Sequence, residues 1–411
     1  MKIDSRTEGK FDLQLLLAVF SLVGIGVAAI YSASSSIPEQ STNYIRQIVS
    51  FGIALVAFLV AFKIPFIYIE KAVLPVYIFA FVLLLLVLAI GKTAGGQKSW
   101  LVFGPLRFQP AEFAKFATVI ALARYLSRTH ISMTSFKDII VALGIGFVPV
   151  ILIMLEPDMG SSLVFGFIII GMLFWRGLPL FLLFLTLSPG IVAVVSLLSD
   201  VLQVPLILAI IALLYFFRES YRGDIFTAVS IITINVAAAY MVDFAYDALS
   251  PHQQLRIQSF IDPMADPLGS GYNAIQAQIA VGSGGFFGKG FLQGNQTQLQ
   301  FIPEQWTDFV FCGIAEEFGF VGSIIVVFLY TFISYRIIRI ASSLRDSFMS
   351  LLVVGFWLIY FAHFIINLGM AIGVVPVIGI PLPFVSFGGS SLIVNLTMLG
   401  IIFNIAKLRV H

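Results

Sequence analysis

The apolar positions of this chain fall into long continuous runs that are separated by short polar segments. Most runs contain roughly 17–25 residues, which is the length of helix needed to cross a hydrocarbon core about 30 Å thick. They predict twelve membrane-spanning helices: 12–33, 45–63, 73–91, 111–127, 138–156, 159–175, 178–198, 201–217, 225–242, 309–334, 349–371 and 386–406. A strand barrel is excluded because its strands would alternate apolar with polar positions. The pattern therefore predicts an all-α, polytopic helix bundle.

The composition agrees with this pattern and narrows the class of protein. Hydrophobic residues make up 59% of the 411 positions and charged residues only 11%, against about 25% charged residues in a soluble domain. A net charge of +2 offers no basic surface for nucleic acid, and the single Cys312 allows neither an internal disulfide nor a cysteine metal cluster. We interpret residues 1–411 as one integral membrane domain with a long loop over about 243–308.

The Lys and Arg residues orient the bundle, because short cytoplasmic loops carry an excess of both. If both chain ends are cytoplasmic, sixteen of the 23 cations lie inside. The seven that remain outside are Arg46, Lys92, Lys98, Arg107, Lys115, Arg256 and Lys289. These exceptions to the charge bias are candidates for a function on the outer face.

Four segments are too polar, or too rich in Gly and Pro, for lipid-facing helix, and all four fall on the outer side. The first covers 95–100 and 107–115, where Pro110 suits the first turn of a helix. Glu112 and Lys115 are three residues apart and share a face. Arg107 and Lys115 together at an outer rim would form an anion site suited to phosphate. The alternative is an interfacial turn with a snorkelling lysine and a local ion pair.

The second segment, 156–160, places Glu156 and Asp158 on either side of Pro157. The pattern favours a tight turn in which Asp158 caps the next helix. The third segment is the long loop, and a structureless loop of this length is usually functional. Its glycine run at 282–290 does not match a P-loop. Ser283 stands in place of the first glycine, and Gly290 stands where Ser or Thr should follow Lys289.

Segment 272–281 of this loop predicts a short interfacial helix, followed by Phe286, Phe287 and Phe291 at the bilayer surface. At the loop's end, Thr307 is expected to cap a helix that carries Asp308 in its first turn. An isolated Asp there usually complements the helix dipole and has no further role. Deeper in the same run, Glu316 and Glu317 are functional candidates, since carboxylates inside a membrane are costly.

The fourth segment, 373–391, contains three prolines and four glycines and cannot be one regular helix. Irregular backbone at membrane depth must be buried in protein or line a wet cavity. We interpret it as a re-entrant segment beside a polar cleft. His363, Asn367 and Asn395 are expected to donate or accept hydrogen bonds between helices.

Together these motifs resemble the SEDS family (shape, elongation, division and sporulation) of bacterial membrane glycosyltransferases. The resemblance covers about 12–406. Its motifs are Gln97-Lys98-Ser99-Trp100, 107–115, Pro157-Asp158-Met159-Gly160, 262–290, 301–317 and the Gly-Ile-Pro-Leu-Pro-Phe-Val-Ser-Phe-Gly-Gly-Ser-Ser run at 379–391. The DPLGSGYN element and 379–383 are more similar to elongation-type than to division-type members. Trp306 departs from the family pattern, which commonly has His before the Thr-Asp pair.

The resemblance implies a peptidoglycan glycosyltransferase that polymerises lipid II on the outer face of the bacterial cytoplasmic membrane during cell elongation. It implies a core of about ten spans. The twelve predicted runs exceed this core by two, and the excess would be an extra helix pair within 178–242. The family's essential carboxylate falls on Asp308, which would act as general base on the acceptor hydroxyl. A class B penicillin-binding transpeptidase and other membrane proteins of the elongation complex are the implied partners.

Arg107 and Lys115 would then neutralise the lipid pyrophosphate, with Mg or Mn as a candidate divalent cation. Glu112 would orient Lys115, and Gln109 would bond to a phosphate or a sugar. The resemblance adds further substrate-binding candidates: Trp100, Lys289, Glu304, Ser386 and Ser390. Three alternatives remain open at this point: a flippase for lipid-linked precursors, a division-type polymerase, and a scaffold for the elongation machinery.

Overall fold

The computed structural model describes the whole chain except residues 1–10, 36, 37, 39, 95, 96, 104, 105, 134, 199, 217–224, 248, 250, 270 and 409–411. Within this part, each of the twelve apolar runs coincides with a long helix. These helices are α1 (Leu13–Ser35), α2 (Asn43–Lys63), α4 (Val73–Ile90), α5 (Pro110–Leu126), α6 (Phe136–Leu155), α7 (Met159–Trp175), α8 (Leu180–Leu198), α9 (Asp200–Phe216), α10 (Ile225–Asp247), α14 (Val310–Ser342), α15 (Ser347–Ala371) and α16 (Gly389–Leu408). The all-α bundle is confirmed, and Pro110 opens α5 as expected.

Seven helices of the described part are long and apolar enough to cross a membrane by length and composition alone. They are α1, α2, α4, most of α6, α14, α15 and α16. In α15, 72% of the most apolar window is buried inside the protein, whereas in α4 the share is 17%. We conclude that α15 is the central helix of a multi-pass membrane protein and that α4 lies at its periphery.

The loops contain more regular structure than the sequence predicts. The first polar segment, for which an interfacial turn was one of two alternatives, lies partly in a three-stranded antiparallel sheet of β1 (Lys92–Ala94), β2 (Gln97–Phe103) and β3 (Leu106–Phe108). The long loop is not structureless, because it holds α11 (Pro251–Ile261), the 3-10 turn η1 (Pro263–Ala265), α12 (Tyr272–Ser283) and α13 (Asn295–Gln298). Strands and helices this short give too few periods to be recognised in a sequence. The short helix predicted at 272–281 is present as α12, while its interfacial position stays a prediction. Helix α3 (Phe66–Lys71) is the remaining short helix.

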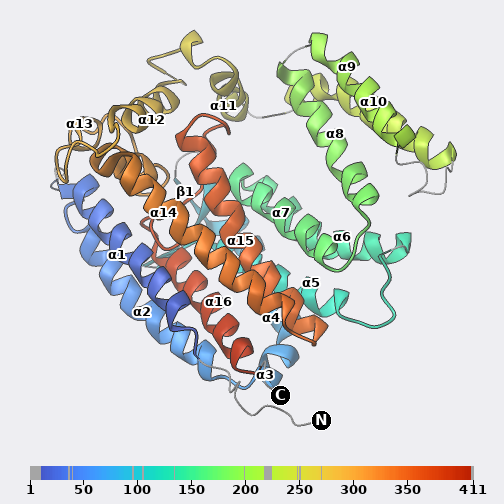
Figure 1. Cartoon of the computed structure of the whole chain (residues 1–411), viewed down its shortest axis with the longest axis horizontal. Helices are drawn as coiled ribbons and strands as arrows, with labels where there is room; N and C mark the ends of the chain where they lie inside the picture. The colour runs from blue at the N-terminus through green and yellow to red at the C-terminus, as the bar shows by residue number, and fades with distance from the viewer. Residues whose placement is uncertain are drawn as a thin grey trace.

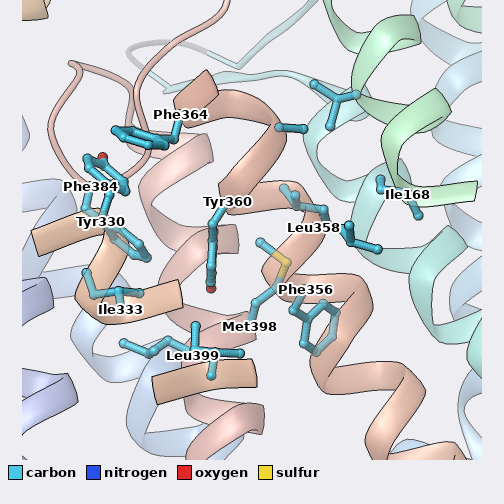
Figure 2. Packing of buried hydrophobic residues seen from close by; sticks show 14 of the residues in the cluster. Ile168, Tyr330, Ile333, Phe356, Leu358, Tyr360, Phe364, Phe384, Met398 and Leu399 are labelled. Carbon is cyan, nitrogen blue, oxygen red and sulfur yellow. The ribbon is translucent and has the colours of Figure 1, made fainter. Parts of the chain in front are cut away.

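The core surrounds α15, which packs against α5, α7 and α14. Figure 2 shows this packing from close by, with Tyr330 of α14 stacked on Phe364 of α15 at 4.5 Å between ring centroids. Tyr360 contacts Phe384, which belongs to the irregular segment, at 5.1 Å. Aromatic pairs of this kind add about 0.5–1.5 kcal/mol beyond the area that they bury. Ile380, Leu382, Phe384 and Val385 are also buried, so this part of the irregular segment belongs to the core.

Helices α8, α9 and α10 form a group of their own beside the rest of the bundle (Figure 1). They share a small apolar cluster of Val192, Ile210, Ile231 and Ala239. The buried Asn235 also donates to Ser188 at 3.0 Å, which joins α10 to α8. The extra helix pair predicted within 178–242 falls in this group, and its status as an insertion stays a prediction.

Helix α14 is interrupted at Gly319, where φ is 64° and ψ is −156°. The interruption frees backbone groups that the apolar interior cannot leave unpaired. The loop before α13 satisfies them through four hydrogen bonds of 2.9–3.2 Å: Lys289 N to Glu316 O, Gly290 N to Glu317 O, Phe320 N to Gly285 O and Val321 N to Phe286 O. The long loop is thus joined to the middle of α14 by its backbone.

Replacing Gly319 should destabilise the protein, because an L residue is strained at this φ and a Cβ would stand 2.3 Å from Gly288 N. We expect Gly319→Ala to lower the free energy of unfolding by about 1–3 kcal/mol. Gly166→Ala in α7 is the matched control, since nothing lies within 4 Å of a Cβ there. Thermal unfolding in detergent measures both variants, and equal melting temperatures would contradict the prediction.

Candidate functional site

The candidate site lies at the end of the bundle that carries α11, α12 and α13, away from α3 (Figure 1). All four of the polar or Gly- and Pro-rich segments singled out in the sequence contribute contacts there. The irregular segment 373–388, which precedes α16, contacts the loop that ends at Asp308 and the turn between α6 and α7. The prediction that 373–391 is not a regular helix is confirmed up to Gly388.

Asp308 precedes the first residue of α14 and is partly buried. The expectation that Thr307 caps a helix containing Asp308 is wrong, because α14 begins at Val310 with Phe309 in the cap position. The hydroxyl of Thr307 donates instead to the carbonyl oxygen of Glu304 at 3.0 Å. A compact turn, closed by the Asp308 N–H bond to Glu304 O at 3.2 Å, therefore presents the carboxylate ahead of the helix.

Two residues on one face of α15 fix the irregular segment beside Asp308. Asn367 is fully buried, and its Nδ2 donates to the carbonyl oxygens of Asp308 and Ile380, both at 2.8 Å. One turn earlier, Nδ1 of His363 lies 2.9 Å from the carbonyl oxygen of Pro381. Residues four apart lie on the same face of a helix, so α15 aligns two consecutive carbonyls of the segment. The interhelical bond expected of His363 is confirmed by its contact with Lys115 on α5, whereas Asn367 bonds to the loop of Asp308 and to the irregular segment.

Ser386 provides a second link between the segment and the loop of Asp308. Its hydroxyl donates to Thr307 O at 2.5 Å and accepts from Leu382 N at 2.7 Å. Gln47 of α2 then donates to Ser386 O at 3.1 Å. Ser386 is 6% exposed, so its hydroxyl shapes the wall of the site.

Lys115 lies behind this wall and not at the rim. Its Nζ is 2.7 Å from Glu112 Oε1 and 2.7 Å from His363 Nε2. Lys115 is 1% exposed and Glu112 3% exposed, whereas Arg107 on β3 is exposed. The shared face of Glu112 and Lys115 is confirmed. A common outer anion site with Arg107 is not what the structure shows, because the ammonium group is enclosed by its partners.

Two carboxylates and one guanidinium set the electrostatics around Asp308. Burial, and next the negative charge of Glu304, raise the pKa of Asp308 to about 6. The hydroxyl of Thr307 and the positive charge of Arg256 lower it, while the charge of Asp158 raises it further. A carboxyl group with a pKa near the working pH can both take up and release a proton.

The α6–α7 turn also belongs to this site. Asp158 is 3% exposed and caps α7 by accepting from Ser161 N at 2.9 Å, as the sequence predicts. Its other oxygen accepts from Gln109 Nε2 at 3.3 Å, which places Gln109 beside the turn. The neighbouring Glu156 is fully buried, and its carboxylate oxygens have no hydrogen-bond partner among the described residues.

The remaining predicted residues lie around the site at different depths. Trp100 is partly buried on β2, where it pairs with Lys92. Glu304 is exposed beside Asp308, and Ser390 is buried in the first turn of α16. Lys289 donates to Glu316 Oε1 at 2.7 Å, so its ammonium group is bound to α14.

Glu316 and Glu317 anchor the long loop to the bundle. Glu316 also accepts from the backbone N–H groups of Gln296 and Thr297, at 2.9 and 3.0 Å. Glu317 accepts from the hydroxyl of Ser32 on α1. We therefore assign these two carboxylates a role in holding the loop in place, because each accepts hydrogen bonds from the loop or from α1.

Sequence reasoning missed Asp158 and Arg256 as members of the site. Helix capping alone accounted for Asp158, so nothing in its sequence pattern indicated a second role in the site. Arg256 of α11 was noticed only as an outer cation that departs from the charge bias. That departure was the available signal, because a cation retained on the outer face needs a local negative partner.

These features define a multi-pass membrane protein with a carboxylate site just outside its spans, and comparison with known proteins gives its family. The family model described as "Cell cycle protein", whose label names FtsW, RodA and SpoVE, matches residues 13–208 and 191–411. The chain belongs to this family, the SEDS proteins.

Its curated relatives include two glycosyltransferases. The peptidoglycan glycosyltransferase MrdB of Escherichia coli K12 is 34% identical over 394 residues, covering 96% of this chain and 93% of that protein. The peptidoglycan glycosyltransferase RodA of Treponema pallidum is 31% identical over 425 residues, covering 96% and 97%.

Two solved structures share the fold across almost the whole chain. A chain from a peptidoglycan synthase complex, whose title describes coordination of polymerization and crosslinking, is 28% identical with a TM-score of 0.73, covering 97% of this chain and 98% of that one. The rod shape determining protein RodA of Thermus thermophilus is 25% identical with a TM-score of 0.64, covering 98% of both chains.

Proposed function

We propose that this chain is a peptidoglycan glycosyltransferase that polymerises lipid II at the outer face of the bacterial cytoplasmic membrane during cell elongation, with both chain ends in the cytoplasm. The observation that carries the proposal is the position of Asp308 two residues before the start of α14, partly buried, with a pKa raised to about 6. The names of the MrdB and RodA relatives support both the reaction and the elongation type.

Asp308 acts as the general base in this proposal. Its carboxylate takes the proton from the acceptor sugar's 4-hydroxyl while that oxygen bonds to the donor's anomeric carbon. The bond between this carbon and the lipid pyrophosphate breaks, and the pyrophosphate leaves with the electron pair. Attack opposite the leaving group inverts the anomeric centre.

The departing pyrophosphate needs positive charge. Arg107 is exposed and can reach an anionic substrate, whereas Lys115 would act from behind the wall through His363 and Pro381. A divalent Mg or Mn ion at the pyrophosphate stays a prediction. Among the described residues no group of three or more His, Cys, Asp or Glu could hold a metal ion, so the residues present do not form a ready cation site.

The protein partners of this chain are also a proposal. The match to a chain of a peptidoglycan synthase complex supports assembly with a crosslinking enzyme. We therefore propose a class B penicillin-binding transpeptidase and other membrane proteins of the elongation complex as partners.

A polymerisation assay in detergent tests the function directly. Purified protein incubated with lipid II should form glycan polymer, which gel electrophoresis of labelled product resolves. A flippase would form none, because detergent leaves no bilayer across which to move a lipid. Lipid II that stays unpolymerised, both with the protein alone and with a class B transpeptidase added, would refute the proposed function.

A further inference from the structure

We infer that Arg256 is a positioning residue of this site: its guanidinium lies against the irregular segment beside Asp308 and favours the ionised form of that carboxylate. The inference rests on the proposed function, because it assigns Arg256 to the reaction that Asp308 performs. Arg256 would thus keep the base ready to accept the proton of the acceptor hydroxyl.

Residues 378–380 of the irregular segment lie close to three other parts of the chain: α11, the loop of Asp308 and the α6–α7 turn. Nη1 of Arg256, on α11, donates to the carbonyl oxygen of Ile378 at 3.5 Å. A Cβ on Gly379 would stand 3.1 Å from Oδ2 of Asp308, so the carboxylate lies directly on the next residue. Gly379 has φ of 73°, a conformation that favours glycine, and its bare backbone leaves room for the carboxylate.

The turn that carries Asp158 approaches the same residues. A Cβ on Gly160 would stand 3.0 Å from Ile378 O and 2.9 Å from the side chain of Ile380. Gly160 follows Asp158 by two residues, and Asp158 is held in place as the cap of α7. The carbonyl oxygen of Ile378 thus accepts from Arg256 and lies close to the backbone of the Asp158 turn.

The charges of these groups influence one another. Arg256 is half-buried; burial lowers the pKa of its guanidinium, and the negative charges of Asp308 and Asp158 raise it. The guanidinium stays protonated in either case. The charged groups that face Asp308 are Glu304 from its own loop, Asp158 from the α6–α7 turn and Arg256 from α11. Of these, Arg256 is the one that favours the carboxylate form.

This arrangement gives α11 a function. α11 is an 11-residue helix that precedes η1 in the long loop, and it is too short to span a membrane. By placing a cation on residues 378–380, it connects the loop to the wall that α15 holds through Asn367. The negative charges of Asp308 and Asp158 thus explain why Arg256 lies on the outer side, against the charge bias.

The pH dependence of polymerisation tests the inference. In detergent with saturating lipid II, the wild-type rate should decline below about pH 6, where Asp308 becomes protonated. Arg256→Gln removes the favourable charge and should move this acid limb upward by roughly half to one pH unit. The rate at pH 6, relative to its alkaline plateau, would then fall about two- to fivefold. Arg256→Lys keeps the charge and should keep the wild-type limb.

Two further variants sharpen the test. Asp158→Asn removes a negative charge while asparagine still caps α7, so it should move the limb to lower pH. It also keeps the inference testable if Arg256→Gln fails to fold. Lys71→Gln, at an exposed cation on α3 at the other end of the bundle, should leave the profile unchanged.

The outcomes separate this inference from the proposed function. An acid limb that stays in place in Arg256→Gln and in Asp158→Asn would overturn it. So would an equal loss of rate at every pH, or a raised KM for lipid II alone, since these indicate folding or phosphate binding. In each case a polymerising wild-type enzyme would leave the proposed function standing, and an inactive wild type would refute the function itself.

Discussion

Asp308→Asn should reduce glycan polymerisation about 10²- to 10⁴-fold, which is the usual contribution of a general base, and leave the fold intact. Asparagine has nearly the same shape as aspartate, but its amide cannot accept the proton of the acceptor hydroxyl. The backbone contacts that hold residue 308, from Asn367 Nδ2 to its carbonyl oxygen and from its own N–H to Glu304 O, do not involve the carboxylate. The variant should therefore separate chemistry from folding.

Initial rates of polymer formation from lipid II measure this loss, and melting temperature reports the fold. Asp346→Asn is a matched control, because Asp346 caps α15 by accepting from Met349 N at 2.8 Å, and asparagine caps equally well. Substantial residual synthesis by Asp308→Asn would remove Asp308 as the base. A scaffold predicts a different result, in which Asp308→Asn supports growth in cells as well as wild type does.

The sequence predicted the features that depend on local pattern. Continuous apolar runs specify spanning helices, since lipid forces every backbone group to bond within its own segment. Pro110 at the start of α5 and the irregular backbone up to Gly388 follow from single-residue constraints on φ and on the amide N–H. These features needed no knowledge of the tertiary structure.

The features that were missed depend on contacts between distant segments. Lys115 was expected at a rim beside Arg107, and only the positions of α15 and His363 show that it is enclosed. Arg256 lies 122 residues from the carbonyl that it contacts. A charge count shows that such a cation needs a partner, and the folded chain is required to identify which one.

Breaking the buried ion pair of α5 should have the largest effect on stability. Lys115→Met leaves the carboxylate of Glu112 uncompensated at 3% exposure, and the loss of one partner of a buried pair costs about 3–5 kcal/mol. Replacing both partners in Glu112→Leu/Lys115→Met should recover most of this loss, because no buried charge is left. The remaining deficit would reflect His363 Nε2, which loses its contact with Lys115.

The chain provides its own reporter and its own control for this measurement. Cys312 is the single cysteine and is fully buried, so the reaction of its thiol with a fluorogenic reagent follows unfolding in detergent. Arg124→Met, on the same helix, breaks the ion pair with Glu70, whose side chains are 44% and 32% exposed. That pair is worth about 0–1 kcal/mol, so Arg124→Met should melt close to wild type.

The same variants decide between two roles for Lys115. If it holds the wall through His363, the lower stability of Lys115→Met should accompany a lower kcat at saturating lipid II, and the double variant should regain part of both. If instead Lys115 binds pyrophosphate directly, as the sequence suggested, Lys115→Met should melt like Arg124→Met and lose rate only at limiting lipid II. The enclosed ammonium group, 2.7 Å from both Glu112 and His363, favours the first outcome.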